Sequence, residues 1–385
     1  MNETMGETVL GNARLVLPDE VRVGHVVLRD GVIAEIGGGA LPRGAIDLEG
    51  DYLMPGLVEL HTDAVEGHLY PRPRVAWNAM AAVTAYDAQI ASAGITTVFD
   101  SLRVWPDKRA VGMEGDAPLL MRTLREAGLA GMLRAEHHVH LRCEVAAEGV
   151  VEDAQALMEE ADVRLISLMD HTPGQRQFLT QEHFRNYYMK KSGITAAEMD
   201  VIVEKRLEAH RLHARPNRQA LVALAHERAI VLASHDDATG VHVEEAREDG
   251  VAIAEFPTTT EAAAGSHQAG IQVLMGAPNL VRGGSHAGNI AAESLARAGT
   301  LDILSSDYVP GSLLLAAFDL PRRVEGIGLA AATRLVSANP ARAAGMNDRG
   351  RIAPGLRADL IRVALAGAGE VPVVRMVWRE GERVA

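Results

Sequence analysis

The sequence predicts an α/β protein that combines a TIM (β/α)8 barrel with a small β-sandwich domain built from both chain termini. Eight short apolar runs alternate with alanine-rich helical segments between residues 56 and 308, which is the pattern of a parallel sheet with crossover helices. Short β-rich pieces separated by turns occupy both ends of the chain. Polar residues follow nearly every apolar run, as they do where the strands of a barrel end at its active face.

The two ends of the chain are expected to form one small β domain. In residues 1–55, "RDG" lies between two apolar runs and predicts a hairpin. Residues 347–385 show the same pattern of short β-rich pieces and turns, with an "EG" turn between two short strands and no helical segment. We therefore predict that these segments complete one sheet and that residues 56–346 form the barrel.

The eight barrel strands are expected within the apolar runs, which cover residues 56–63, 94–100, 132–144, 163–171, 230–237, 251–259, 271–279 and 301–308. The connection between the fourth and fifth runs is much longer than the others. Besides an ordinary crossover helix it holds a charged helical insertion at about residues 172–215. Long insertions on the active face are often lids. A helical hairpin with no role in activity, or one that supports dimerisation, is an equal alternative.

The bulk composition restricts the class of protein. The chain has 385 residues, of which 48% are hydrophobic, so it is expected to be globular. No apolar run reaches the length of a membrane-spanning helix, and the first residues lack the pattern of a signal peptide. A single cysteine, Cys143, suits a reducing compartment, so we expect a cytoplasmic protein. The formal charge of -13 argues against nonspecific nucleic-acid binding.

Histidines and carboxylates at the strand ends are the candidate metal ligands, because one cysteine cannot make a cysteine-rich site. In "HTD", side-chain alternation points His61 and Asp63 the same way. In "AEHHVHLRCE", the same alternation turns His140 and Glu144 toward the barrel interior. A solvated wide end of the barrel is the alternative explanation for so many inward polar residues.

Three later strand ends add further candidates. "SLMDH" offers His171 next to Asp170, and "SHDDAT" offers His235, with Asp236 or Asp237 to orient it. "SSDY" places Asp307 at the end of the eighth strand, where a carboxylate can accept a proton from water. Asp307 could instead cap the following turn.

These motifs resemble the amidohydrolase superfamily, whose members open the barrel with a "PGL...H-x-H" strand and carry a late Asp and a closing "G-x-I-x-x-G-x-x-A-D-L" segment. This chain has "MPGLVELHTD", Asp307 and "GRIAPGLRADL". It departs from most members in having H-x-D, and it lacks an obvious Lys at the end of the fourth strand that could be carboxylated to bridge two metals.

The longer strings resemble one branch of that superfamily, the PhnM diphosphatase family of the carbon-phosphorus lyase pathway. They are "EGHLYPRP", "RAEHHVHLRCE", "SLMDHTPGQRQF", "ASHDDAT", "AEFPTT", "LMGAPNLVRGGSHAGN" and "DILSSDYVP". The resemblance implies hydrolysis of α-D-ribose 1-methylphosphonate 5-triphosphate to the 5-phosphate and pyrophosphate. It also implies one or two divalent ions, with Zn²⁺ expected and Mn²⁺ or Mg²⁺ as alternatives. Gly67 departs from the basic residue expected there in many relatives.

A polyanionic substrate on an acidic protein requires concentrated local cations. Arg282 precedes a Gly-rich turn, and the residues after it are expected to begin a helix whose N-terminus favours an anion. The candidate substrate-binding residues are Arg72, Arg74, Arg142, Arg176, Arg282, Ser285 and His286.

Two other functions stay open on the sequence. The same barrel could cleave a C–N bond as a deacetylase, cyclic amidase or deaminase, because fold does not determine chemistry. A degenerate barrel kept for binding or assembly is the third alternative, although a scaffold has no reason to keep this set of histidines and acids. The sequence also leaves open whether the protein forms a homo-oligomer.

Overall fold

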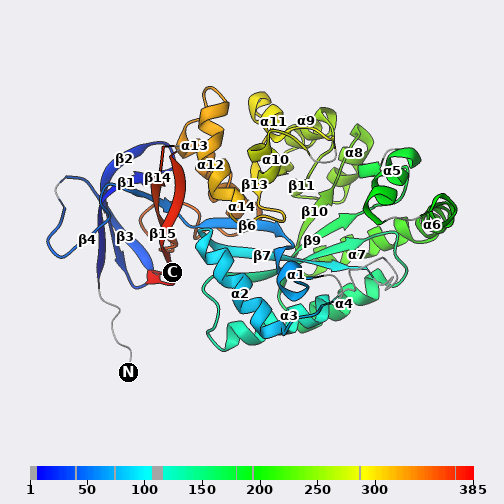
Figure 1. The fold of residues 1–385 in the computed structure, drawn as a ribbon, viewed down its shortest axis with the longest axis horizontal. Coiled ribbons are helices and arrows are strands. Elements are labelled where there is room, and N and C mark those ends of the chain that lie inside the picture. Colours follow the sequence, from blue (N-terminus) through cyan, green and yellow to red (C-terminus); the bar gives the residue numbers. More distant parts are fainter. Residues whose placement is uncertain are drawn as a thin grey trace.

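The computed structural model describes residues 7–39, 41–72, 75–105, 116–178, 180–192, 195–285, 288–368 and 370–385. Its two parts lie side by side: a sheet made from both chain ends and a larger body of parallel strands surrounded by helices (Figure 1). Among the described helices, none is long and apolar enough to cross a membrane.

The terminal sheet is mixed and joins both ends of the chain, as predicted. Its strands run in the order β16-β15-β14-β5-β1-β2-β3, with β4 paired to β1. They are β1 (Thr8–Val16), β2 (Val21–Arg29), β3 (Val32–Gly37), β4 (Ile46–Asp47), β5 (Tyr52–Pro55), β14 (Leu360–Ala366), β15 (Val371–Arg379) and β16 (Glu382–Arg383). The antiparallel pairing of β14 with β5 connects the two termini. The hairpin at "RDG" is present, because Asp30 and Gly31 adopt the positive φ angles that its tight turn needs.

Eight parallel strands form the second sheet in strict chain order. They are β6 (Leu57–Thr62), β7 (Ile95–Val104), β8 (Glu136–Glu144), β9 (Val163–Met169), β10 (Val231–His235), β11 (Ile253–Glu255), β12 (Gln272–Gly276) and β13 (Ile303–Ser305). Seven of them lie within the predicted runs, and β7 begins in the run at residues 94–100 but continues four residues beyond it. The first and last strands meet at a parallel bridge between Thr62 and Asp307, where the Asp307 N–H donates to the His61 carbonyl at 3.1 Å. This contact closes the near-barrel, so the predicted fold class is confirmed.

Helices cover the outside of the barrel (Figure 1). They are α1 (Ala64–Leu69), α2 (Ala79–Ser92), α3 (Ala117–Leu129), α4 (Val150–Glu160), α7 (Arg215–Glu227), α8 (Gly240–Glu248), α9 (Thr260–Gln268), α10 (Ala277–Arg282), α11 (Ala292–Ala298), α12 (Ser312–Arg323), α13 (Leu329–Arg334) and α14 (Ala338–Ala343). Their apolar faces and the outward side chains of the strands form the largest buried cluster.

Additional helices occupy the long connection after β9, on the side away from the terminal sheet (Figure 1). They are the short 3-10 helix Arg176–Phe178, α5 (Gln181–Ser192), α6 (Ala196–Ala209) and a π-helical turn at His210–Ala214. Their own small core consists of Phe178, Phe184, Met199 and Val203. The predicted limits of this insertion, at about residues 172–215, stay a prediction. The same holds for the limits of the segments 1–55, 56–346 and 347–385.

The barrel interior changes from apolar to polar along the strands, and this change positions the site. Leu165, Ala233 and Ile253 belong to the apolar cluster inside the barrel. Two residues further along the same strands lie Ser167, His235 and Glu255, all of them buried. Because side chains alternate along a strand, these residues point to the same interior one layer nearer the strand ends. The apolar layer therefore supports a buried polar layer above it.

Candidate metal centre

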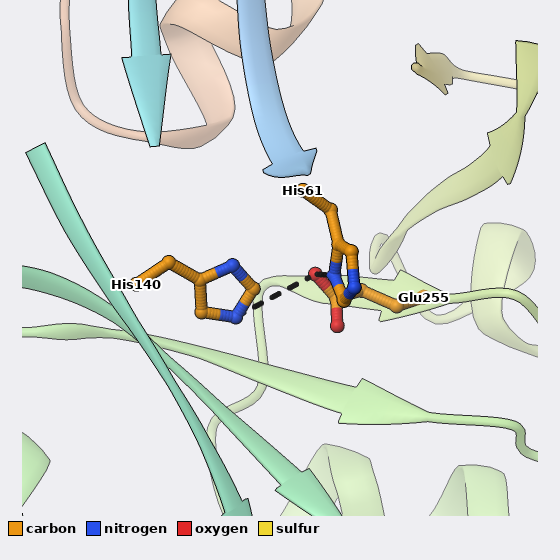
Figure 2. Close-up of side chains that lie close together, drawn as sticks. All are labelled: His61, His140 and Glu255. Atoms are coloured by element: carbon orange, nitrogen blue, oxygen red, sulfur yellow. Dashed lines mark hydrogen bonds and ion pairs between the residues drawn. The ribbon is translucent and has the colours of Figure 1, made fainter. Parts of the chain in front are cut away.

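Glu255, the last residue of β11, lies at the centre of the buried polar layer. Its Oε1 atom lies 2.9 Å from Nδ1 of His61 and 3.8 Å from Nε2 of His140. Its Oε2 atom lies 3.1 Å from Nδ1 of His235. Figure 2 shows the His61, His140 and Glu255 side chains converging from different strands. Their ligand atoms lie within 4.8 Å of one another, which is close enough for one ion.

A second group of potential ligands adjoins the first through His235. The Nε2 atom of this imidazole lies 3.5 Å from Oδ2 of Asp236, which also lies 3.8 Å from Nε2 of His171. These three side chains form a separate set within 4.8 Å. Since Nδ1 of His235 faces Glu255 and Nε2 faces Asp236, one imidazole borders both groups. The arrangement therefore offers places for one or two divalent ions.

The backbone just after the strands helps to place these groups. Asp236, Phe256 and Asp307 each follow a strand and adopt a left-handed conformation, with φ angles of 58°, 53° and 53°. Such conformations are uncommon outside glycine and often occur at functional sites. The turn at Phe256 puts its ring edge-on against His61 and His235, at centroid distances of 4.9 and 5.4 Å. This contact fixes both imidazoles from one side.

The electrostatics of the first group suit a cation. Burial lowers the pKa of His140 and of His235 to about 3, so both imidazoles are neutral at pH 7 and keep a lone pair for a metal. Burial opposes ionisation of Glu255, but its interactions with the neighbouring histidines, including hydrogen bonds from His61 and His235, outweigh burial and hold the pKa of this carboxyl well below its usual range. Imidazole nitrogens around a carboxylate are the donor set that Zn²⁺ and similar divalent ions prefer, so the residues present fit a metal.

Hydrogen bonds from neighbouring strands orient these ligands. Ser167 donates to Oε2 of Glu255 at 2.5 Å and also contacts Nε2 of His140. Glu144 accepts from Nδ1 of His171 at 2.7 Å, which directs Nε2 of that ring toward Asp236. Carboxylates that hold a ligand imidazole in this way tune its orientation and basicity. Glu144, predicted as a ligand, therefore contacts the candidate ligand His171 in this structure and belongs to neither ligand group.

Comparisons with known proteins agree with this geometry. An amidohydrolase family model matches residues 81–385. The chain belongs to the amidohydrolase family. It is also 43% identical over 380 residues to the alpha-D-ribose 1-methylphosphonate 5-triphosphate diphosphatase of Escherichia coli K12, covering 98% of this chain and 100% of that protein. The resemblance drawn from the sequence motifs is thus confirmed.

Solved amidohydrolases have the same fold at low identity. One is 17% identical with a TM-score of 0.65, and the match covers 98% of each chain. The 5-methylcytosine deaminase from Klebsiella pneumoniae, solved with phosphonocytosine, is 16% identical with a TM-score of 0.65, covering 99% of this chain and 98% of that one. At these identities the likeness concerns the fold.

The predicted metal ligands of this amidohydrolase fall into two sets. His61, His140, His171 and His235 all lie in the two ligand groups. Asp63 lies apart from both groups and accepts from Nη1 of Arg142 at 3.2 Å. A metal role for Asp63 and for Glu144 stays a prediction.

Asp307 lies at the seam of the barrel, where its backbone N–H contacts His61. Besides the backbone contact between these residues, the hydroxyl of Thr62 donates to the Asp307 carbonyl at 2.6 Å. The buried Glu59 supports the same seam, because it accepts from Ser305 Oγ at 2.8 Å and from the His61 N–H at 2.6 Å. Burial raises the pKa of Glu59 to about 7.

The predicted substrate-binding residues are scattered. Arg142 lies in the barrel mouth, whereas Arg176 is buried in ion pairs with Asp237 and Glu245. Arg72 and Arg282 are exposed. Ser285 lies between α10 and α11, and Arg74 and His286 lie outside the described residues.

The helix expected to begin at about residues 285–289, after the Gly-rich turn that follows Arg282, begins later. α11 starts at Ala292, and the Ala292 N–H donates to Asn279 Oδ1 at 3.0 Å. The expected position of this helix start was therefore wrong. The turn is longer because Asn279 from α10 holds both Ile290 and Ala292, which fixes the chain up to the helix.

Glu255 was not among the predicted ligands, and Asp236 was predicted only as a residue that orients His235. Glu255 ends a strand of three residues, so its periodicity is too short to show which way the side chain points. One signal was available. "AEFP" places an acid two residues after the apolar Ile253, the same spacing that separates Ala233 from His235. This equal spacing indicates that the side chains of Glu255 and His235 both point into the barrel interior.

Proposed function

We propose that this amidohydrolase cleaves α-D-ribose 1-methylphosphonate 5-triphosphate to the 5-phosphate and pyrophosphate. The observation that carries the proposal is the full-length similarity to the Escherichia coli diphosphatase, at 43% identity over 98% of this chain. The two adjoining ligand groups at the barrel mouth support it, because phosphoanhydride hydrolysis commonly uses divalent ions.

We assign His61, His140 and Glu255 to one ion and His171, His235 and Asp236 to a second, with Zn²⁺ as the expected metal. When bound, such ions polarise phosphoryl oxygens and make water easier to deprotonate. Glu144 and Ser167 orient the ligands, as their hydrogen bonds to His171 and Glu255 require.

The reaction needs a base close to the α-phosphorus, and we assign this role to Asp307. A carboxylate oxygen of Asp307 accepts a proton from water as the water oxygen forms its bond to the α-phosphorus. The bond from that phosphorus to the bridging oxygen breaks, and its electron pair leaves with pyrophosphate. Arg142 and other cations at the barrel mouth stabilise the charge that develops on the phosphates.

The proposal is tested by a direct competition between reaction classes. Purified, metal-loaded protein is incubated with the ribose triphosphate, with nucleoside triphosphates and with N-acyl and cyclic amide compounds, and pyrophosphate and amine release are followed. We expect pyrophosphate from the ribose triphosphate at a higher kcat/KM than from nucleoside triphosphates. Amine release without pyrophosphate would instead support a C–N hydrolase. The expected location in the cytoplasm stays a prediction.

A further inference from the structure

A third segment bridges the first and last barrel strands before they reach the ligand groups. The N–H of Val58 in β6 donates to the carbonyl of Val336 at 3.0 Å, and the N–H of Leu304 in β13 donates to the carbonyl of Leu335 at 2.9 Å. Both acceptors lie between α13 and α14, so these N–H groups bond to a connecting segment instead of to the opposite strand. The register between β6 and β13 therefore depends on contacts nearer the strand ends.

Nearer the strand ends, the fully buried side chain of Glu59 connects the two strands directly. Its Oε2 atom accepts from the N–H of Ser306 at 2.5 Å, and its Oε1 atom accepts from the N–H of His61 at 2.6 Å. The hydroxyl of Ser305 lies 2.8 Å from the same Oε1 atom and 2.5 Å from the carbonyl of His61. One carboxylate on β6 thus holds the backbone at the end of β13.

The backbone of Asp307 comes directly after the residues that Glu59 holds. Asp307 has a φ angle of 53°, a left-handed conformation that a residue other than glycine keeps only where its surroundings fix it. On one side Glu59 binds the N–H of Ser306, and on the other the hydroxyl of Thr62 donates to the Asp307 carbonyl at 2.6 Å. These contacts fix the backbone from which the Asp307 carboxylate extends.

The contacts of Glu59 require an acceptor at both side-chain oxygens. The N–H groups of Ser306 and His61 can only donate, and each faces a different oxygen of the carboxylate. A glutamine of the same shape has one acceptor oxygen, and its NH₂ group would face the other N–H. The two oxygens of a carboxylate are therefore what keeps both strand ends bound.

We propose that Glu59 is a positioning residue that holds Asp307, the assigned base, in its working place at the barrel seam. The proposal rests on the role of Asp307 given under the proposed function. A reacting group that moves by about 1 Å can lower a rate about 100-fold. Loss of the contacts from Glu59 should therefore reduce turnover and leave substrate binding nearly unchanged.

Glu59→Gln is the first variant to measure. We expect kcat to fall about 10- to 100-fold while KM stays within about threefold of the wild type. Metal content should be retained, because the imidazole of His61 keeps its contact with Glu255. Wild-type kcat in this variant would overturn the proposal. Loss of metal would overturn it as well, since Glu59 would then act through His61.

Asp87→Asn is the matched control, because Asp87 is also a fully buried carboxylate that accepts from backbone N–H groups. Its Oδ1 atom accepts from Arg134 at 2.8 Å and from Ala135 at 3.0 Å, outside the two ligand groups. Thermal unfolding is measured for both variants. Asp87→Asn should lower stability as Glu59→Gln does, but its kcat should stay within about twofold of the wild type.

A double-mutant cycle with Asp307→Asn shows whether Glu59 acts through Asp307. If it does, Glu59→Gln has almost no further effect on kcat once Asp307→Asn has removed the base. A purely structural role would lower kcat by the same factor in both backgrounds, and that result would overturn the proposal. If Glu59→Gln does not fold, the same cycle is run with Ser305→Ala, which removes one contact to Glu59 and should lower kcat about 3- to 10-fold.

The cycle separates this inference from the proposed function. It needs only a measurable turnover, so it is run on the ribose triphosphate or on an amide, whichever the wild type hydrolyses. Pyrophosphate release by the wild type tests the proposed function by itself. Equal factors in the two backgrounds would overturn the role of Glu59 on either substrate.

Discussion

Nδ1 of His61 lies 2.9 Å from Oε1 of Glu255, although 194 residues separate them in the chain. The two side chains come from the first and sixth strands of the barrel, and both are almost completely buried. A carboxylate buried in this place is costly without a cation to balance it. The pair therefore identifies the first ligand group more sharply than any single motif.

Glu255→Gln should remove metal from the first group. The amide keeps the size of the side chain but loses the negative charge that the ion needs, so we expect metal content to fall and kcat to drop at least about 100-fold. Elemental analysis and pyrophosphate release measure the two effects. Glu248→Gln, at an exposed position on α8, is the control. Full metal content and activity in Glu255→Gln would show that Glu255 is not a ligand.

The two ligand groups should hold separate ions. His140→Ala is expected to lose the ion of the first group, and His171→Ala the ion of the second, because each imidazole belongs to one group only. His235→Ala should disturb both, since its two nitrogens face Glu255 and Asp236. Titration of metal-free protein with Zn²⁺ measures the stoichiometry. One ion in the wild type, lost equally in all three variants, would contradict a second site.

Asp307→Asn should keep the metal and lose most of the turnover. The substitution removes a base but none of the six residues in the two ligand groups, and loss of a general base typically costs about 10²- to 10⁴-fold. Metal analysis together with kcat separates the two properties. Asp162→Asn, at an exposed position, is the control. Parallel loss of metal would make Asp307 a ligand, and unchanged kcat would remove it from the mechanism.

Stability should fall at alkaline pH because of a buried network outside the site. Nδ1 of His137 lies 2.9 Å from Asp100 and Nε2 lies 3.3 Å from Asp87. Burial alone would lower the pKa of His137, but the two carboxylates outweigh it and raise this pKa to about 9. The protonated form is therefore favoured by folding. Its contribution is fully present below about pH 6.5 and is lost as the pH rises through about 9.

Urea unfolding at pH 6.5 and at pH 9.5 measures this effect. The wild type should lose up to about 3 kcal/mol of unfolding free energy between the two, and His137→Gln should lose much less. His226→Gln, an exposed position on α7, should behave as the wild type does. Equal pH dependence in the wild type and in His137→Gln would rule out His137 as the cause.

Much of the fold could be predicted because it depends on local patterns. Strand and helix positions follow from apolar periodicity, and a chain of alternating strands and helices closes into a barrel whose active face is at the strand ends. From the sequence alone, that rule predicts that His61, His140, His171 and His235 lie in one region, and the structure places all four in the two ligand groups. The RDG hairpin and the joining of both termini in one sheet likewise followed from turn residues and strand length.

The barrel, the terminal sheet and the layer that holds the ligands can be predicted from the sequence, since they depend on spacing within short segments. Which side chains meet depends instead on packing between distant parts of the chain. It placed Glu255 between three histidines, paired Asp63 with Arg142, and put Arg206 of the insertion over Trp105. These contacts join residues far apart in the chain. Strand register and the path of the insertion set their distances, and neither can be derived from periodicity, because periodicity fixes the direction of a side chain but not its partner.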